Sequence, residues 1–141
     1  MNKKLDCILL VDDDFSTNFL NQMILKKAGI AEHVETVLNG KEALEYLTNT
    51  GKYEANGTVF PRPSLIFLDI NMPVMDGWEF LAAYHKLPEY QKGQIVIVML
   101  TASFNPDDET RAGKIPEITG FRNKPLSLKM LADIMEKYFP E

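Results

Sequence analysis

Two apolar runs of the chain end directly in carboxylates, and this pattern indicates a chemical site. Residues 7–11 are apolar and lead into Asp12 and Asp13, and residues 65–68 are apolar and lead into Asp69. An uninterrupted apolar run bounded by turn residues is typical of a strand that is buried on both faces of a parallel sheet. Each carboxylate is then expected at the carboxyl end of its strand, where open α/β sheets bind their ligands.

A hydroxyl group and an ammonium group follow two later strand-like segments in the same way. The apolar run 95–100 ends at Thr101, and the short segment 118–122 is followed by Lys124. The carboxyl ends of parallel strands lie at one edge of the sheet, so residues that are far apart in sequence meet there. We therefore expect one pocket that contains Asp12, Asp13, Asp69, Thr101 and Lys124.

The expected pocket favours phosphoryl transfer assisted by a metal ion. Three carboxylates cannot all remain ionised without compensating positive charge, and Lys124 supplies only one such charge. The candidate metal ligands in this pocket are all oxygens, which favours a hard cation such as Mg²⁺. Positioning and charge neutralisation dominate phosphoryl transfer. Asp69 is the candidate nucleophile because an aspartate can form an acyl phosphate, and Thr101 and Lys124 are candidates to bind the transferred group.

Strands and helices that alternate along the chain are expected to position these residues. The first predicted helix is capped by Asp14 or Ser16 and ends at Gly29. Its apolar residues at helical spacing are Phe19, Leu20, Met23, Ile24 and Ala28. The strands are predicted at 7–11, 33–38, 65–69, 95–100 and 118–122, and the later helices at 40–47, at 77–87, after Asn105 and after Ser127. Strands that alternate with helices five times imply a parallel sheet covered on both faces.

Length and composition narrow the class of protein. The chain has 141 residues, 45% of them hydrophobic and 25% charged, which is typical of one soluble globular domain. Its net charge of −5 argues against direct binding to nucleic acid or to an anionic membrane. It contains one cysteine, and we find neither a signal peptide nor an apolar run of about 20 residues. These features predict a cytoplasmic protein.

The motifs in these places resemble the receiver domain of two-component response regulators. The motifs are Val11-Asp12-Asp13, the segment from Asp69 to Gly77, Leu100-Thr101-Ala102 and Asn123-Lys124-Pro125, and they occur in the family's order over about the whole chain. The resemblance implies a flavodoxin-like (βα)5 sandwich with strand order 2-1-3-4-5. It also implies a single receiver domain over residues 1–141 without an output domain.

The resemblance further implies a role for individual residues. Asp69 would accept a phosphoryl group from a phosphohistidine on a sensor histidine kinase or a histidine phosphotransfer protein. Asp13 would bind Mg²⁺ directly and Asp12 mainly through a water molecule, and the backbone carbonyl of Asn71 would be a third protein ligand. The protein would then be a signalling phosphoacceptor rather than an enzyme, and its only reactions would be self-phosphorylation and autodephosphorylation.

The family's switch and output elements also have counterparts here. Thr101 and Phe121 match its switch pair, and the peptide bond at the position of Lys124-Pro125 is usually cis in the family. The last helix and the segment before it would bind a downstream protein whose identity the sequence does not reveal. The segment 48–63 is longer than is usual in the family, and the fourth helix is short, so the usual output face is expected to be altered.

Other interpretations stay open at this point. Asp12, Asp13 and Asp14 could cap a helix, and Phe121 could be a packing residue. Asp12 and Asp14 also mimic the nucleophile and acid of a small haloacid-dehalogenase-like phosphatase. A receiver-like scaffold that is never phosphorylated is the third possibility.

Overall fold

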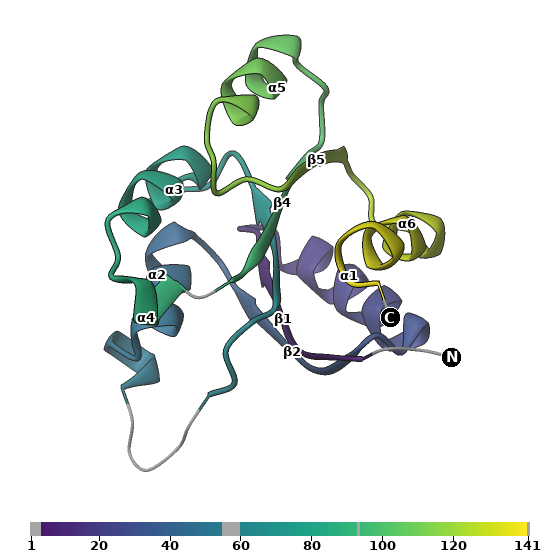
Figure 1. The fold of residues 1–141 in the computed structure, drawn as a ribbon, viewed down its shortest axis with the longest axis horizontal. Coiled ribbons are helices and arrows are strands. Elements are labelled where there is room, and N and C mark those ends of the chain that lie inside the picture. The colour runs from purple at the N-terminus through teal and green to yellow at the C-terminus, as the bar shows by residue number, and fades with distance from the viewer. Residues whose placement is uncertain (1–3, 55–59, 93, 141) are drawn as a thin grey trace.

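The computed structural model describes residues 4–54, 60–92 and 94–140, which form a five-stranded parallel sheet covered by helices on both faces (Figure 1). The strand order is β2-β1-β3-β4-β5, so the predicted fold class and strand order are confirmed. The strands are β1 (Leu5–Val11), β2 (Ala31–Val37), β3 (Leu65–Asp69), β4 (Val96–Thr101) and β5 (Gly120–Asn123). The helices are α1 (Phe15–Ala28), α2 (Gly40–Thr48), the 3₁₀ helix η1 (Gly51–Tyr53), α3 (Gly77–His85), α4 (Glu89–Lys92), α5 (Pro106–Gly113) and α6 (Leu128–Tyr138).

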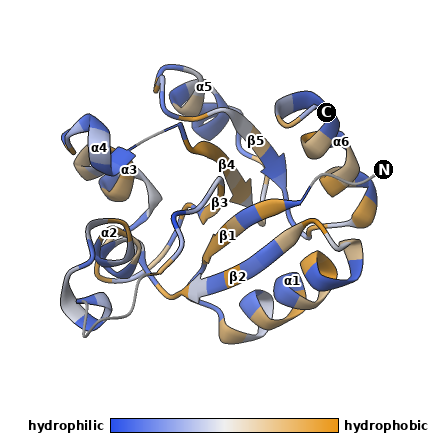
Figure 2. Cartoon of the chain, turned by 60° about the horizontal axis from the view of Figure 1, so that its bottom comes forward, coloured by the Kyte–Doolittle hydropathy of each residue, from blue (hydrophilic) through white to orange (hydrophobic). Residues whose placement is uncertain are grey.

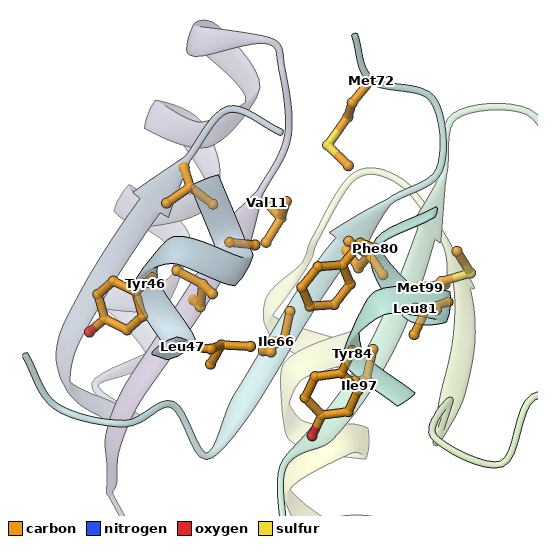
Figure 3. Close-up of a cluster of buried hydrophobic side chains, with 14 of the residues drawn as sticks. Val11, Tyr46, Leu47, Ile66, Met72, Phe80, Leu81, Tyr84, Ile97 and Met99 are labelled. Carbon is orange, nitrogen blue, oxygen red and sulfur yellow. The ribbon is translucent and has the colours of Figure 1, made fainter. Parts of the chain in front are cut away.

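The two faces of the sheet carry separate apolar cores. The β1 and β3 side chains alternate between the two cores, and every side chain of β3 is buried. Figure 3 shows the core under α2 and α3, in which Phe80 and Ile66 are fully buried. The other core lies under α1 and α6 and contains Phe67 and Ile134. Burial on both faces explains why these strands are continuous apolar runs.

Local side-chain hydrogen bonds begin the helices that flank the sheet. Asp14, Asn39, Asn105 and Ser127 are N-caps, and each accepts a hydrogen bond from a backbone N–H of its helix. Asp76 forms a capping box at the start of α3. At the other end of α1, Gly29 has a φ of 66°, a left-handed conformation that glycine adopts without steric cost.

Three of the five apolar residues whose spacing predicted the first helix are exposed. Phe19, Leu20 and Met23 are 55%, 60% and 54% exposed. Buried positions of α1 include Asn18 and Leu25 instead. Figure 2 shows apolar residues around much of this helix, so the apolar pattern does not select one face. The predicted helix is confirmed, but its apolar spacing does not identify its buried side.

The connection between α2 and β3 contains structure that the sequence did not predict. Tyr53 of η1 is buried, with its ring centroid 5.0 Å from that of Tyr46 and 5.3 Å from that of Phe60. Residues 55–59 of the predicted 48–63 connection lie outside the described residues. The one-turn helix α4 was also not predicted, whereas the short helix after Asn105 is confirmed as α5.

No helix in the described parts of the chain is both long enough and apolar enough to cross a membrane.

Candidate functional site

The ends of β1 and β3 bring three carboxylates together. Val11 pairs with Leu68 in the sheet, so the residues that follow each strand are neighbours. Carboxylate oxygens of Asp12, Asp13 and Asp69 lie within 4.8 Å of one another. Asp12 and Asp69 are buried, whereas Asp13 is exposed. This is the convergence that the sequence predicted at the sheet edge.

Lys124 lies between two of these carboxylates. Its Nζ donates to Oδ2 of Asp12 at 2.5 Å and lies 3.1 Å from Oδ1 of Asp69. The backbone N–H of Lys124 donates to the carbonyl oxygen of Thr101 at 2.8 Å, which ties the end of β5 to the end of β4. The peptide bond between Lys124 and Pro125 is cis, as expected from the resemblance.

Lys124 offsets only part of the negative charge of Asp12 and Asp69. Burial raises the pKa of Asp69, and the neighbouring charge of Asp12 raises it further, so that Lys124 does not restore the ordinary value. Burial by itself would lower the pKa of Lys124. The hydrogen bonds and charges of Asp12 and Asp69 outweigh burial, and the pKa of Lys124 is raised. The site therefore favours an additional positive charge.

The donor set fits a hard divalent cation. The three carboxylates supply oxygen ligands, and their oxygens are close enough together to share one ion. The raised pKa of Asp69 also favours a cation at this place, because a bound cation would stabilise the ionised form of the carboxylate. Asn71 lies two residues after the end of β3, is exposed, and lines the same hollow as Asp69 and Lys124.

The hydroxyl group of Thr101 is bonded within its own loop. It donates to the carbonyl oxygen of Ser103 at 2.7 Å and accepts from the Ser103 N–H at 3.3 Å. Thr101 nevertheless lines the hollow beside Asp69. Phe121 pairs with Met99 in the sheet, is half-buried, and packs against the core under α2 and α3.

Asn18 belongs to this site, although the sequence reasoning did not select it. Its Nδ2 donates to the carbonyl oxygens of Asp12 at 2.9 Å and of Val37 at 3.3 Å. It thereby holds the turn that carries Asp12 and Asp13 against the end of β2. No clear signal in the sequence marks this role, because polar residues surround Asn18 in the first half of the helix.

Gly77 is a second residue that was not recognised as part of the site. A Cβ atom at this position would lie 2.6 Å from the backbone carbonyl oxygen of Asp69, so only glycine fits. Its N–H donates to the carbonyl oxygen of Ile70 at 2.8 Å. Gly77 thus lets α3 begin directly against the segment that carries Asp69.

Asp14 does not occupy the position of a catalytic acid. Its carboxylate accepts hydrogen bonds from the Ser16 N–H at 3.3 Å and from the Thr17 hydroxyl at 2.6 Å. The Thr17 hydrogen bond is the main reason why the pKa of Asp14 is lowered. Asp14 is thus the N-cap of α1. This geometry removes the acid that the phosphatase interpretation requires.

Comparison with known proteins agrees with the fold and with the resemblance to receiver domains. A family model described as the response regulator receiver domain matches residues 8–136. The response regulator Rcp1 of Synechocystis sp. is 39% identical over 101 residues, which cover 72% of this chain and 65% of Rcp1. Sporulation initiation phosphotransferase F of Bacillus subtilis is 29% identical over 140 residues, which cover 99% of this chain and 96% of that protein. These matches give no support to the haloacid-dehalogenase-like interpretation.

Solved structures of response regulators have the same fold as this chain. A two-component response regulator from Cytophaga hutchinsonii is similar at a TM-score of 0.83 with 30% identity, covering 99% of this chain and 100% of that chain. The Mn²⁺-bound form of Rcp1 is similar at a TM-score of 0.75 with 32% identity, covering 94% of each chain. With the family model matching nearly the whole chain and the carboxylates and lysine gathered at the expected edge, this protein belongs to the response regulator receiver domain family.

Proposed function

We propose that the chain is a signalling receiver in which Asp69 accepts a phosphoryl group from a phosphohistidine of a sensor histidine kinase or a histidine phosphotransfer protein. A carboxylate oxygen of Asp69 would attack the phosphorus atom, and an acyl phosphate would form as the P–N bond to the imidazole breaks. The observation that carries the proposal is the position of Asp69, which lies 3.1 Å from Lys124 and lines an open hollow. The ammonium group of Lys124 would pair with an oxygen of the transferred group.

We infer that Asp12, Asp13, Asp69 and the backbone carbonyl of Asn71 hold the divalent cation that receiver domains bind, and that this cation is Mg²⁺. All these ligands are oxygens, and Mg²⁺ accepts a few protein oxygens together with water or phosphoryl oxygens. When bound, the cation supplies positive charge for the phosphoryl oxygens. Asp13 is the exposed carboxylate of the set and would bind the cation directly, and Asp12, already bonded to Lys124, would act mainly through a water molecule.

Thr101 and Phe121 are proposed as the switch pair. In the present structure the Thr101 hydroxyl is bonded to Ser103, so its turn toward a phosphoryl group would break those hydrogen bonds. Phe121 is only half-buried, so an inward turn of its ring would bury more of its apolar surface. The outcome would be a changed surface around β5 and α6, where we expect a downstream protein to bind.

The phosphodonor is proposed to dock on α1. Phe15 begins this helix and is 77% exposed, and Leu20 is 60% exposed. Phe19 and Met23 extend the exposed apolar surface, which begins beside the Asp12-Asp13 turn. Exposed apolar surface of this kind marks a protein-binding site, and a helical phosphodonor seated there would bring its histidine near Asp69.

Two measurements test the assignment of Asp69. We expect Mg²⁺-dependent, saturable binding of beryllofluoride, followed by the fluorescence of Trp78 and by NMR, and its loss in Asp69→Asn. We also expect transfer of radiolabelled phosphate from a phosphohistidine donor to the wild type but not to Asp69→Ala. Asp133→Asn, which changes an exposed aspartate of α6, is the matched control and should behave as the wild type. Undiminished labelling of Asp69→Ala would refute the assignment. If the wild type showed neither beryllofluoride binding nor labelling, the protein would be a receiver-like scaffold that is not phosphorylated.

A further inference from the structure

A groove between α3 and the end of α5 lies outside the proposed phosphorylation site. Its floor is apolar and includes Trp78 and Leu81 from α3 and Ile115 from the segment after α5. Three cationic side chains, those of Lys86, Arg111 and Lys114, line it together with this floor. We call this surface the basic groove.

The charge of the basic groove contrasts with that of the whole chain. The protein has a net charge of −5, yet Lys86, Arg111 and Lys114 are all exposed around one apolar floor. Within the described parts of the chain, no carboxylate oxygen lies within 4.0 Å of the cationic groups of these three residues. The cations are therefore available to a ligand that carries negative charge.

The acidic residue that lines the groove already has a hydrogen-bond partner within the chain. Glu117 is held by His85, whose Nδ1 lies 2.5 Å from the Glu117 Oε2. This contact joins the end of α3 to the segment before β5, and Glu117 forms no ion pair within 4.0 Å with any of the three cations of the groove. The groove is thus cationic at its rim although the protein is acidic.

The floor of the basic groove is held in place before any ligand arrives. The guanidinium carbon of Arg111 lies 4.3 Å from the centroid of the Trp78 ring, a distance typical of cation–π stacking. Trp78 is half-buried and packs against the core under α2 and α3. A preformed apolar surface costs less ordering on binding, which favours association.

We propose that the basic groove binds an acidic amphipathic segment of a partner protein. Apolar side chains of the segment would lie on Trp78 and Ile115, and its carboxylates would face Lys86, Arg111 and Lys114. An amphipathic helix supplies both kinds of group at the required spacing. Nucleic acids and anionic lipid headgroups supply the negative charge, but the apolar floor is better matched by the side chains of a peptide. This surface is distinct from α1 and from the output face around α6.

The test uses a synthetic amphipathic peptide with leucine at helical spacing and glutamate elsewhere. Trp78 is the single tryptophan of the chain, so its fluorescence and its indole N–H resonance report on the groove directly. We expect saturable binding that weakens with added salt, and no binding of the matched peptide in which lysine replaces glutamate. Lys114→Glu should weaken binding by at least about tenfold, since a rim cation becomes a repulsive charge.

Two control variants separate the groove from general charge effects. Lys129→Glu makes the same charge change on α6 and should leave peptide affinity unchanged. Ala82→Glu places a bulky acid at an exposed groove position of α3 and should abolish binding, whereas Ala132→Glu on α6 should not. A titration that is silent by both fluorescence and NMR would overturn the proposal, as would equal losses in Lys114→Glu and Lys129→Glu. Tighter binding of an oligonucleotide or of anionic vesicles would overturn it in favour of that ligand.

Discussion

Lys124 is the positive charge that two buried carboxylates, Asp12 and Asp69, share. Lys124 is shared between Asp12 and Asp69, so neither carboxylate has a full counter-charge. Burial, followed by the charge of Asp12, accordingly raises the pKa of Asp69. A carboxyl group whose pKa is higher in the folded than in the unfolded protein makes folding less favourable as the pH rises through the folded pKa.

We therefore expect Asp69→Asn to be more stable than the wild type at neutral pH when a chelator removes divalent cations. The advantage should shrink as the pH falls through the pKa of Asp69 in the folded protein, because the wild-type group then becomes neutral as well. Urea unfolding of both proteins over a series of pH values measures this difference. Asp133→Asn should show no such pH-dependent gain. A loss of stability in Asp69→Asn at neutral pH would mean that its pairing with Lys124 outweighs the cost of burial.

Asn18 acts on the site through the backbone of Asp12. We expect Asn18→Ala to weaken Mg²⁺-dependent beryllofluoride binding by about tenfold, because the turn that carries Asp12 and Asp13 loses its anchor. Stability should fall by about 1–3 kcal/mol, because buried carbonyl oxygens lose a donor. Asn21→Ala, which removes a buried amide one turn later on α1, is the control for purely structural effects. If both variants bind beryllofluoride with equal affinity, Asn18 has only a structural role.

At the scale of elements, the loop between β3 and α3 has an unusual backbone conformation. Val74 has a φ of 67°, although β-branched residues rarely adopt this left-handed region, and it is 74% exposed. The residue after Val74 bonds this loop to the start of α2, because the Gly40 N–H donates to the Met75 carbonyl oxygen at 2.8 Å. Contacts of the neighbouring residues therefore impose this conformation on Val74, and its exposed side chain contributes little packing energy.

We expect Val74→Gly to stabilise the protein by about 1 kcal/mol, since glycine adopts this conformation without strain and little packing is lost. The net gain is smaller than the strain itself because glycine also makes the unfolded chain more flexible. Chemical denaturation measures the change, with Val74→Ile as the control that keeps the β-branch and should show no gain. A destabilised Val74→Gly would show that the Val74 side chain contributes packing after all.

At the scale of the whole molecule, apolar surface is distributed unevenly. The cores under both faces of the sheet are closed, while Phe15, Phe19, Leu20 and Met23 of α1 remain exposed. The exposed side of α1 and the basic groove differ in charge and location, so they would serve different partners.

Leu20→Glu should leave the free energy of unfolding within about 0.5 kcal/mol of the wild type, because the side chain is exposed. It should slow phosphotransfer from a phosphohistidine protein that labels the wild type by about tenfold, through lost docking. Labelling by a small phosphodonor such as acetyl phosphate should be unaffected, since no docking is needed. Leu128→Glu on α6, which also changes an exposed leucine, is the control. Equal rates of protein-dependent transfer in both variants would exclude α1 as the docking surface.

Much of the fold and the core of the site could be predicted because their signals are local. Continuous apolar runs identified the strands, and Asp69 at the end of one run marked the sheet edge. Cap residues such as Asn39 and Ser127 located helix starts. The family resemblance added the strand order and the cis peptide bond before Pro125. The cytoplasmic location stays a prediction.

Only the tertiary structure decided features that depend on which surfaces meet. The orientation of α1 is one, because apolar residues occur on more than one side and the buried hydrogen bonds of Asn18 lie on the inward side. The sharing of Lys124 between Asp12 and Asp69 is another: the sequence predicted one pocket for all three, but the tertiary packing decides which carboxylates the ammonium group contacts. The basic groove is a third, because α3 and α5 supply its parts from distant segments. Sequence periodicity records how much apolar surface an element has, whereas the competition among all packing partners determines which surface is buried.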